Sequence, residues 1–573
     1  MSFPNFPIPP LDDSPLRQGH EVPAPPSFLD LVQGNILKGH GRDRMRLVYF
    51  KFGDPVRGRN LLPASVAGAQ PWVTSASHQV MQISLHKAYV QNWFQAEILK
   101  HGAAELALRG ERAHFLSLDD GVRLAPVVPP QPLLPPPDPE ETVFGSLMLT
   151  AAGMRALGLL PPDRFFQFFA QGMYDRMTPP GLDADLRADW QAPYLGDAIH
   201  GLFVLACTNE TTLEARTLAL APWCRQFDVT VLDQFVESGT TWRGPSLYDP
   251  TGPTRSERGL PREPFGYADG ISVSRFFRSQ RSLGAPPSGM PTAWDWIDLQ
   301  LPDVFIRPED SATHAGGSFL AFVKYEQDVA AFRTYEASLA AALVRDAGLD
   351  PVSAARMAEA LLVGRTRFGA PMIQVLVHIA RSQNLEFQRL LPFLPADVAR
   401  LLDGHGPPDE VVAAMNEFDF ASTRAGACPF HAHVRKVNPR VDDPAVDTRG
   451  HDGIVARQMV RRGMLWDPQN LLPSAEDAAR ASRPSWPTGG VGLLFMAYMR
   501  DLVGQFETLH HAWAAGENFP PGNPGDRDGV LFGLEKSWSF AGANFNPMAR
   551  PTKQRGGAYF YVPSIAWLQN PRV

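Results

Sequence analysis

The chain has 573 residues, of which 44% are hydrophobic and 20% are charged, and it is long enough to form two large domains of a soluble globular protein. Its formal net charge of −7 argues against a nucleic-acid-binding protein and against tight attachment to anionic membranes. No apolar stretch reaches the roughly 18 residues that a membrane span requires, so we expect no membrane partner.

The first residues of the chain, 1–27, are rich in proline and lack the basic region and apolar run of a signal peptide. We interpret them as a Pro-rich N-terminal arm. Cys207, Cys224 and Cys428 are isolated and show no C-x-x-C spacing, which argues against a disulfide framework or a zinc ribbon. Both features fit a reducing compartment, and we expect a cytoplasmic protein.

Short β-rich runs followed by helical patterns recur along both halves of the chain. In the first half they occupy residues 44–52, 145–160 and 200–220, and a bare strand closes the series at 226–235. In the second half they occupy 317–343 and 490–513, and another strand closes at 557–568. Because these strands are only half apolar, they predict helices packed on one face of an antiparallel sheet. We therefore expect an α+β fold of two ferredoxin-like domains with antiparallel sheets and peripheral helices.

Changes in composition suggest where the domains begin and end. Residues 28–240 form the predicted N-terminal ferredoxin-like domain and 316–573 the C-terminal one. Residues 241–315, which are rich in Gly, Pro, Ser and charge, are interpreted as a connector. The stretch 126–142 predicts a Pro-rich surface loop, and 346–412 predicts a partly helical elaboration of the second domain.

The stretch CPFHAHVRKVNPR, residues 428–440, combines two histidines with three basic side chains, Arg435, Lys436 and Arg440. A neutral imidazole is the commonest metal ligand, and clustered basic side chains point to a bound anion. If the segment is extended, His431 and His433 lie on the same face. The alternative is a solvated surface loop.

Two further stretches carry charged side chains in unusual settings. In EPFGYADGIS, Asp269 stands between glycines within the predicted connector; the alternative is an ordinary turn residue. In QMVRRGMLW, Arg461 and Arg462 end an apolar run, and solvated surface arginines are the alternative there.

The stretch GLLFMAYM, residues 492–499, predicts a strand. Strand side chains alternate, so Leu493 and Phe495 point to the same face. Ordinary core packing is the alternative interpretation of these two residues.

Taken together, these stretches resemble the dye-decolourising peroxidases, a family of haem enzymes. The family motif G-x-x-D-G stands here as residues 266–270, CPFHAHVRKVNPR resembles the proximal-histidine segment, and VRRGMLW resembles the distal-arginine segment. The resemblance extends from LVQGNILKGHGR (31–42) to QRGGAYFYVPSIAWL near the C-terminus. It covers the chain from about residue 28, with the pieces in the family's order.

The resemblance implies a role for each candidate residue. Because the ligand histidine of the family directly precedes the x-Arg-Lys step, His433 would bind the iron of one haem b per chain, in a pocket of the C-terminal domain. Arg440, and after it Arg435, would meet the haem propionates. Asp269 and Arg461 would be the catalytic pair, and Leu493 and Phe495 an apolar wall of the pocket.

The implied function is a peroxidase that reduces hydrogen peroxide and oxidises bulky aromatic or phenolic reductants by way of a ferryl intermediate. Trp466 and Trp513 are candidates for an electron relay, with simple packing as the alternative, and homo-oligomer formation is left open. One alternative is a haem-handling protein, which would not need Asp269. Another is a protein that binds zinc or a similar metal through His431, His433, His510 and His511, although no cysteine or carboxylate pattern supports it.

Overall fold

The structure is a computed structural model, and it describes residues 27–68, 70–80, 82, 142–177, 187–243, 261–267, 269, 276, 299–367, 372, 428–439, 454, 456–473, 485–520 and 525–573. Three predicted features fall wholly or mostly outside these ranges: the N-terminal arm, the Pro-rich loop 126–142, and the part of the predicted elaboration that follows residue 372.

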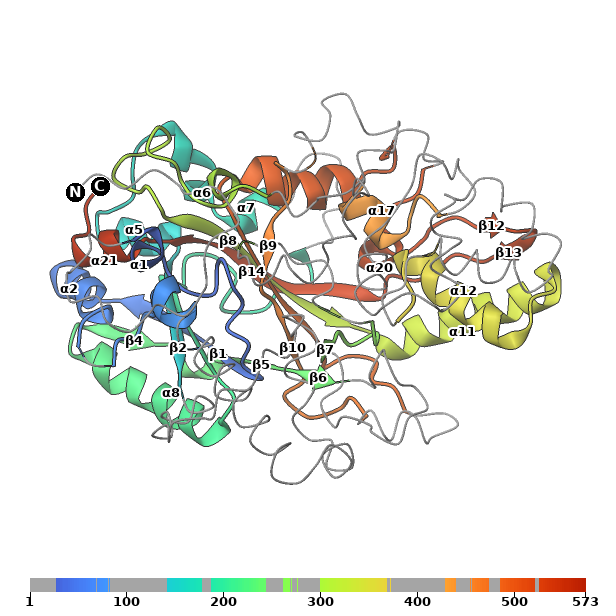
Figure 1. Cartoon of the computed structure of the whole chain (residues 1–573), viewed down its shortest axis with the longest axis horizontal. Coiled ribbons are helices and arrows are strands. Elements are labelled where there is room, and N and C mark those ends of the chain that lie inside the picture. Colours follow the sequence, from blue (N-terminus) through green and yellow to red (C-terminus); the bar gives the residue numbers. More distant parts are fainter. Residues whose placement is uncertain are drawn as a thin grey trace, which may run out of the picture.

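One antiparallel sheet of ten strands runs through the molecule (Figure 1). Its strands follow the order β10-β5-β1-β3-β2-β14-β8-β11-β9, and β4 pairs with β1. Because β10 pairs with both β5 and β11, the path returns on itself and the sheet closes. The strands are β1 (Arg44–Phe52), β2 (Phe144–Leu149), β3 (Gly201–Cys207), β4 (Val229–Val231), β5 (Glu237–Thr240), β8 (Ser318–Gln327), β9 (Val460–Arg461), β10 (Met464–Trp466), β11 (Gly492–Met499) and β14 (Thr552–Val562).

Both halves of the chain contribute a run of strands to this sheet. The two runs meet where Tyr561 of β14 lies opposite Leu149 of β2, and again where Leu465 of β10 lies opposite Thr240 of β5. The α+β class and the antiparallel pairing are confirmed. The exact domain boundaries stay a prediction.

Side chains meet across the interior of the closed sheet. The rings of Tyr49 on β1 and Phe322 on β8 lie 6.3 Å apart, although these strands are not neighbours. Likewise the Lys324 ammonium lies 2.6 Å from the Glu237 carboxylate. This interior explains why every residue of β2 and β3 is buried. The predicted arrangement of helices on one face of an antiparallel sheet is present, and the closure of the sheet also buries the other face of these strands in an apolar core.

Helices surround the sheet. In the first half of the chain, and at its C-terminal end, they are α1 (Phe28–Leu31), α2 (Pro55–Ser65), α5 (Ala151–Ala156), α6 (Gln167–Gln171), α7 (Met173–Arg176), α8 (Glu210–Arg225) and α21 (Ile565–Gln569), with 3-10 turns η3 (Arg164–Phe166) and η5 (Asp233–Phe235). In the second half they are α10 (Leu301–Val304), α11 (Val329–Ala347), α12 (Pro351–Val363), α17 (His433–Val437), α20 (Gly529–Phe532) and the π-helical segment η7 (Leu502–Ala514).

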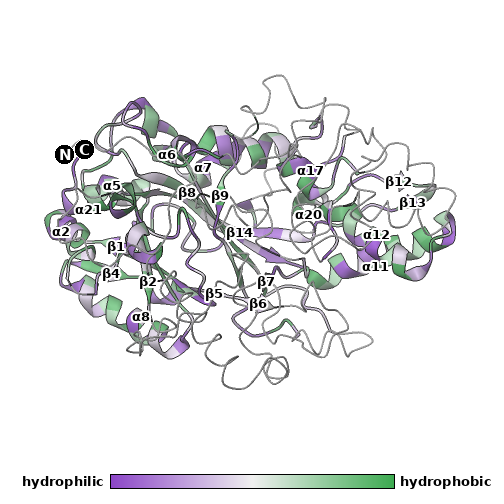
Figure 2. Ribbon diagram, viewed as in Figure 1, coloured by the Kyte–Doolittle hydropathy of each residue, from purple (hydrophilic) through white to green (hydrophobic). Residues whose placement is uncertain are grey.

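A second hydrophobic core forms between α11 and α12, at the opposite end of the molecule from α1 and α2 (Figure 1). Apolar and polar residues alternate around both helices (Figure 2), as expected for helices with one buried face. Asp350 caps the start of α12, and Gly348 ends α11 in the left-handed conformation. Two short ribbons, β6 (Trp242–Arg243) with β7 (Pro261–Arg262) and β12 (Trp538–Phe540) with β13 (Ala543–Phe545), complete this part of the fold.

Most predicted elements are present where the patterns place them. The runs at 44–52, 145–160, 200–220, 317–343 and 490–513 each contain the expected strand, and a helix follows the strand in the last four. The strand predicted over 226–235 is shorter, because the chain forms β4 and then the 3-10 turn η5. No helix that the structure describes is long and apolar enough to cross a membrane.

Candidate functional site

His433 is the first residue of α17, and its ring is held by a buried carboxylate. Nδ1 lies 2.7 Å from Oδ2 of Asp528, whose side chain is fully buried. The other carboxylate oxygen of Asp528 accepts the backbone N–H groups of Val530 and Leu531 at the start of α20. An ionised carboxylate only accepts, so Nδ1 of His433 donates to it, and in the neutral ring this leaves the lone pair on Nε2. Nε2 has no hydrogen-bond partner among the described residues, and the side chain is 30% exposed.

The second histidine of this segment points elsewhere. The chain turns at His431 and enters α17 at His433, so the segment is not extended and the two rings do not share a strand face. The His431 ring packs 4.4 Å from the ring of Trp538, with Nδ1 4.0 Å from the Asp526 carboxylate. Burial lowers the pKa of His431 to about 3. His431 is a neutral core residue.

The basic side chains of the segment meet backbone carbonyl oxygens. Arg435 is buried, donates to the carbonyl of Cys428 and lies 4.1 Å above the ring of Phe430. Lys436 donates to the carbonyls of Gly516 and Phe519. The expectation that these charges gather around an anion is therefore not met by Lys436, and Arg435 has a clear structural role. Arg440 lies outside the described residues.

Arg461 and Asp269 come together from distant parts of the chain. Arg461 is accessible, yet burial lowers its pKa, and the charge of Asp269 acts in the opposite direction. A guanidinium with both properties lies in a recess of the protein, because a side chain on a convex surface would be fully hydrated. Asp269 is itself exposed and close enough for the two charges to interact.

The strand register places Arg461 beside the predicted apolar wall. Arg461 lies opposite Ala497 of β11, and cross-strand partners share a face of the sheet. Leu493 and Phe495, four and two residues before Ala497, lie on that same face and are partly buried, whereas Leu494 is fully buried on the other face.

The π-helical segment η7 links this face of the sheet to α17. The ring of Phe495 lies 6.2 Å from that of Phe506 on η7, and η7 packs against α17, which carries His433. The geometry thus assembles an oriented imidazole, an apolar wall and an arginine–carboxylate pair in one region of the fold.

No family model matches the chain. Among curated proteins it is similar to the multifunctional dye peroxidase DyP2 of Amycolatopsis sp., with 26% identity over 95% of this chain and 96% of that protein. It is also similar to the dye-decolorizing peroxidase AauDyP1 of Auricularia auricula-judae, with 28% identity over 66% of each. The fold resembles the solved structures of the Amycolatopsis DyP2, with a TM-score of 0.63 and 24% identity over 95% of this chain and 96% of that one. It also resembles a DyP-type peroxidase from Anabaena sp., with a TM-score of 0.60 and 21% identity over 95% and 94%.

The chain belongs to the dye-decolourising peroxidase family.

As a dye-decolourising peroxidase, the chain has one important site residue that its sequence did not reveal. Asp528 caps α20 far along the chain from His433, and no local pattern marks it as the partner of a histidine. The one available signal was that an aspartate directly before a helix can cap it, which would fix the orientation of its carboxylate.

The two tryptophans proposed as relays are buried in this dye-decolourising peroxidase. Trp466 donates its indole N–H to the carbonyl of Tyr325 at 2.8 Å and lies 4.6 Å from the Lys324 ammonium. Trp513 stacks on Phe519 with ring centres 4.8 Å apart. Both positions have a packing role, and their relay role stays a prediction.

The four histidines of the alternative metal site are held apart by separate contacts. His510 contacts Gln554 at 2.9 Å, and His511 lies 3.3 Å from the sulfur of Met177. Within the described part of the chain, no three His, Cys, Asp or Glu side chains are grouped to hold a metal ion. The described residues of this family member therefore do not favour a zinc site.

Proposed function

We propose that the protein is a haem peroxidase of the dye-decolourising type, which reduces hydrogen peroxide and oxidises bulky aromatic or phenolic reductants. The observation that carries the proposal is the pairing of an oriented imidazole, His433, with the Arg461–Asp269 pair in a member of this family. The curated relatives carry the name dye peroxidase or dye-decolorizing peroxidase, and dyes are bulky aromatic molecules.

The described residues fit a haem, and we infer one haem b per chain. A histidine that holds haem iron needs a free lone pair on one ring nitrogen and a hydrogen-bond partner on the other that fixes the ring, and His433 with Asp528 would supply both. The macrocycle needs an apolar wall, which Leu493 and Phe495 would form. We keep Arg440 as the first candidate for a propionate and Arg435 as the second; a guanidinium matches a carboxylate with two parallel hydrogen bonds.

When bound, the haem would supply the redox chemistry that peroxide reduction needs. Asp269 moves the proton. Its carboxylate takes the proton from one oxygen of hydrogen peroxide and returns it to the other, which leaves as water. Arg461 stabilises the negative charge that develops on the leaving oxygen, since a fixed donor in a recess needs no reorganisation.

The pairing of Arg461 with Asp269 favours a peroxidase over a haem-handling protein. Holding or storing haem requires the imidazole and the apolar wall. It does not require a carboxylate beside a partly desolvated guanidinium, because desolvating that charge costs free energy. The pair is therefore best explained by proton transfer and charge stabilisation.

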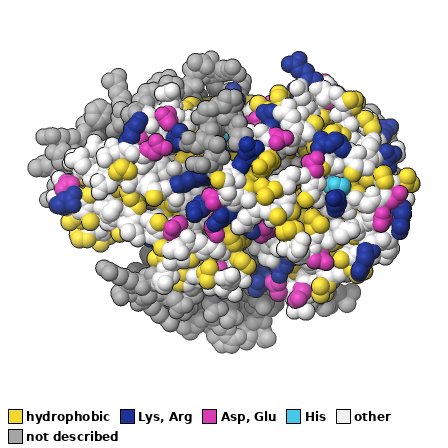
Figure 3. Space-filling view, turned by 180° about the vertical axis from the view of Figure 1, so that it is seen from behind, with side chains coloured by type: hydrophobic (Ala, Val, Ile, Leu, Met, Phe, Trp, Pro, Cys, Tyr) yellow, Lys and Arg dark blue, Asp and Glu magenta, His cyan; other side chains and the backbone are white. Residues whose placement is uncertain are grey.

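The proposed cellular location and partners are supported by the state of the cysteines and by the distribution of surface charge. Cys207, Cys224 and Cys428 are free and buried, which supports the proposal of a cytoplasmic, reducing location. Acidic and basic side chains are interspersed on the face shown in Figure 3, which suits small-molecule partners better than nucleic acid. Homo-oligomer formation stays open.

A spectrum and a turnover assay test the proposal together. The purified protein supplied with haem should show a Soret band and should oxidise a bulky dye only when hydrogen peroxide is present. A protein with the Soret band but without peroxide-dependent turnover would instead be a haem-handling protein. A protein that binds no haem would contradict the proposal altogether.

A further inference from the structure

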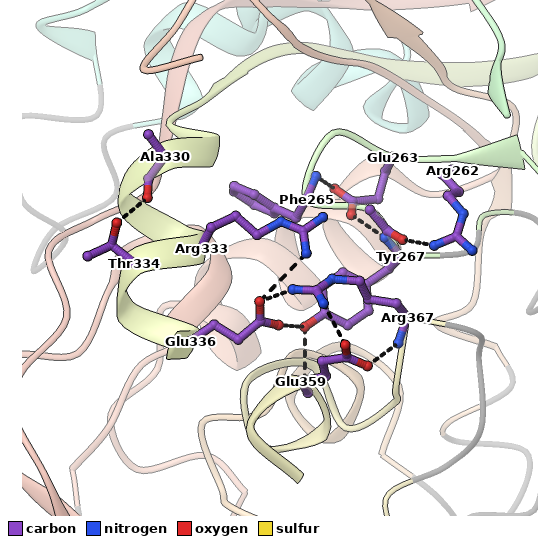
Figure 4. Close-up of polar contacts among 11 residues, drawn as sticks. Arg262, Glu263, Phe265, Tyr267, Ala330, Arg333, Thr334, Glu336, Glu359 and Arg367 are labelled. Carbon is purple, nitrogen blue, oxygen red and sulfur yellow. Dashed lines mark hydrogen bonds and ion pairs between the residues drawn. The ribbon is translucent and has the colours of Figure 1, made fainter. Parts of the chain in front are cut away.

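The loop that carries Asp269 is anchored by a buried group of charges between α11, α12 and β7 (Figure 4). We call this group the arginine–glutamate cluster. It consists of Arg262, Glu263, Arg333, Glu336, Glu359 and Arg367. None of these residues belongs to the candidate site described above, so their function needs another explanation.

The side chain of Glu263 hydrogen-bonds to the backbone of its own loop. Its carboxylate accepts the backbone N–H groups of Phe265 at 3.0 Å and Tyr267 at 2.9 Å. Arg262 donates to the carbonyl of Gly266 at 2.6 Å, and the backbone N–H of Glu263 donates to the carbonyl of Tyr267. The conformation up to Tyr267 is therefore fixed by side chains as well as by the backbone.

Tyr267 joins this loop to both helices. Its hydroxyl lies 3.1 Å from Oε1 of Glu336 on α11 and 2.9 Å from the backbone carbonyl of Glu359 on α12. The ring packs edge-on against Phe332. Asp269 follows only two residues later, so the position of Tyr267 limits where the Asp269 carboxylate can lie.

Two arginines form ion pairs with Glu336 and Glu359, the two residues that the Tyr267 hydroxyl contacts. Arg367 bridges the carboxylates of Glu336 and Glu359, with Nη1 2.5 Å from Oε1 of Glu359. Nη1 of Arg333 lies 3.7 Å from Oε2 of Glu336. Figure 4 shows Arg333 and Arg367 reaching Glu336 from different sides.

Stability alone is a weak explanation for such a cluster. Burial raises the pKa of Glu263 and Glu359 and lowers that of Arg333, and it lowers the pKa of Arg367 to about 9. Desolvating these charges has a cost that apolar residues of similar size would avoid. A buried cluster with equal numbers of positive and negative side chains favours one geometry. Any displacement would leave a buried charge without its partner, so the cluster fixes the positions of the groups attached to it.

We propose that Glu336 and Arg367 are positioning residues, which act through Tyr267 to hold the loop so that Asp269 stays beside Arg461. This inference rests on the proposed function for the role of Asp269. The placement of the loop by the cluster can be tested without it.

The first test measures the loop and needs neither haem nor turnover. Glu336→Gln keeps the shape of the side chain and removes one negative charge. Amide hydrogen exchange in a peptide that covers residues 263–269 should become at least about tenfold faster. The matched control is Asp310→Asn, which removes a partly buried carboxylate held by Arg307 and Arg500 in another part of the fold. It should leave exchange in that peptide unchanged.

The second test measures the chemistry as a function of pH. In Glu336→Gln, kcat/KM for peroxide should fall between about ten- and a hundredfold near neutral pH. The loss should shrink at high pH, where hydroperoxide anion needs no base, as in Asp269→Asn. The Soret band and the KM for the reductant should be unchanged. Tyr267→Phe should lower the rate less, and the double variant should be no worse than Glu336→Gln alone, since both changes weaken the same contact between Tyr267 and Glu336.

The outcomes separate this inference from the proposed function. Unchanged exchange of the 263–269 peptide in Glu336→Gln would overturn the positioning role, whatever the enzyme does. Faster exchange with an equal rate loss at every pH would also overturn it, because that result indicates general damage. A parent protein without peroxide turnover would instead contradict the proposed function, and the exchange experiment would still decide whether the cluster holds the loop.

Discussion

Arg461 ends β9 and Arg462 follows it directly, and because side chains alternate along an extended chain the two point to opposite sides. Arg462 donates to the backbone carbonyls of Asn35, Ile36 and Leu37 at 3.0–3.1 Å and thereby fastens the N-terminal segment of the described chain. Arg461 lies on the face of Leu493 and Phe495.

We therefore expect the two alanine variants to differ in kind. Arg461→Ala should slow peroxide reduction by about a hundredfold or more while haem stays bound, because one fixed donor is typically worth ~3 kcal/mol. Arg462→Ala should keep the rate and lower the free energy of unfolding by about 2 kcal/mol, since three carbonyl groups lose a charged donor. Stopped-flow kinetics and denaturant titrations distinguish them, and the reverse pattern would show that Arg462 faces the site.

Asp269 can be tested through pH. Asp269→Asn removes the base, so peroxide reduction should fall sharply near neutral pH. At high pH more of the peroxide is already deprotonated, and the difference from the parent protein should narrow. The measurement is kcat/KM for peroxide from about pH 5 to 10. A constant ratio between variant and parent across that range would argue that Asp269 is not the base.

At the scale of elements, the loop 261–267 shows why the motif begins with glycine. Gly266 has a φ of +95°, and a Cβ there would clash with the Nη2 atom of Arg333. The glycine thus permits both the left-handed turn and the close approach of the loop to the arginine–glutamate cluster.

Gly266→Ala should therefore displace Arg333 and the loop. We expect peroxide turnover to fall about tenfold or more and the protein to be destabilised by about 1–3 kcal/mol. Gly348→Ala is the matched control: its φ is +66°, and open space surrounds the position of its Cβ. It should cost about 1 kcal/mol of stability at normal turnover. Equal turnover losses in both variants would contradict the account.

Local patterns predicted the elements better than their partners. The strands β1, β3 and β8 follow from their apolar runs, and α12 from its periodicity. The closure of the sheet depends on the β5–β10 and β2–β14 pairings, which join distant segments and leave no local signal. The site shows the same division. His433 and Arg461 were proposed from the resemblance, whereas Asp528 was missed because its role depends on a contact across 95 positions.

At the scale of the whole molecule, the structure keeps several histidines neutral in its interior. Burial lowers the pKa of His40 and His431 to about 3 and that of His314 to about 4. In the unfolded chain these groups titrate near 6.5. Between the folded and unfolded pKa values the unfolded state binds more protons, so the free energy of unfolding rises with pH in that window and is lost on acidification.

We therefore expect the stability of the protein to fall steeply below pH 6.5. From pH 6.5 to 5 each such histidine should remove up to about 2 kcal/mol from the free energy of unfolding. Denaturant titrations at a series of pH values measure the slope, and His431→Gln should make it shallower. A stability that is constant from pH 7 to 5 would show that these histidines are not buried as neutral groups.

We propose that His433, and not the nearby His431, holds the haem. The most direct measurement is the visible spectrum of His433→Ala and His431→Ala, purified side by side with haem supplied. His433→Ala should lose haem or bind it weakly and without activity, and added imidazole should partly restore the spectrum. His431→Ala should keep the Soret band and most of the activity, because the His431 ring packs against Trp538 in the core. A colourless His431→Ala beside a red-brown, active His433→Ala would contradict the account.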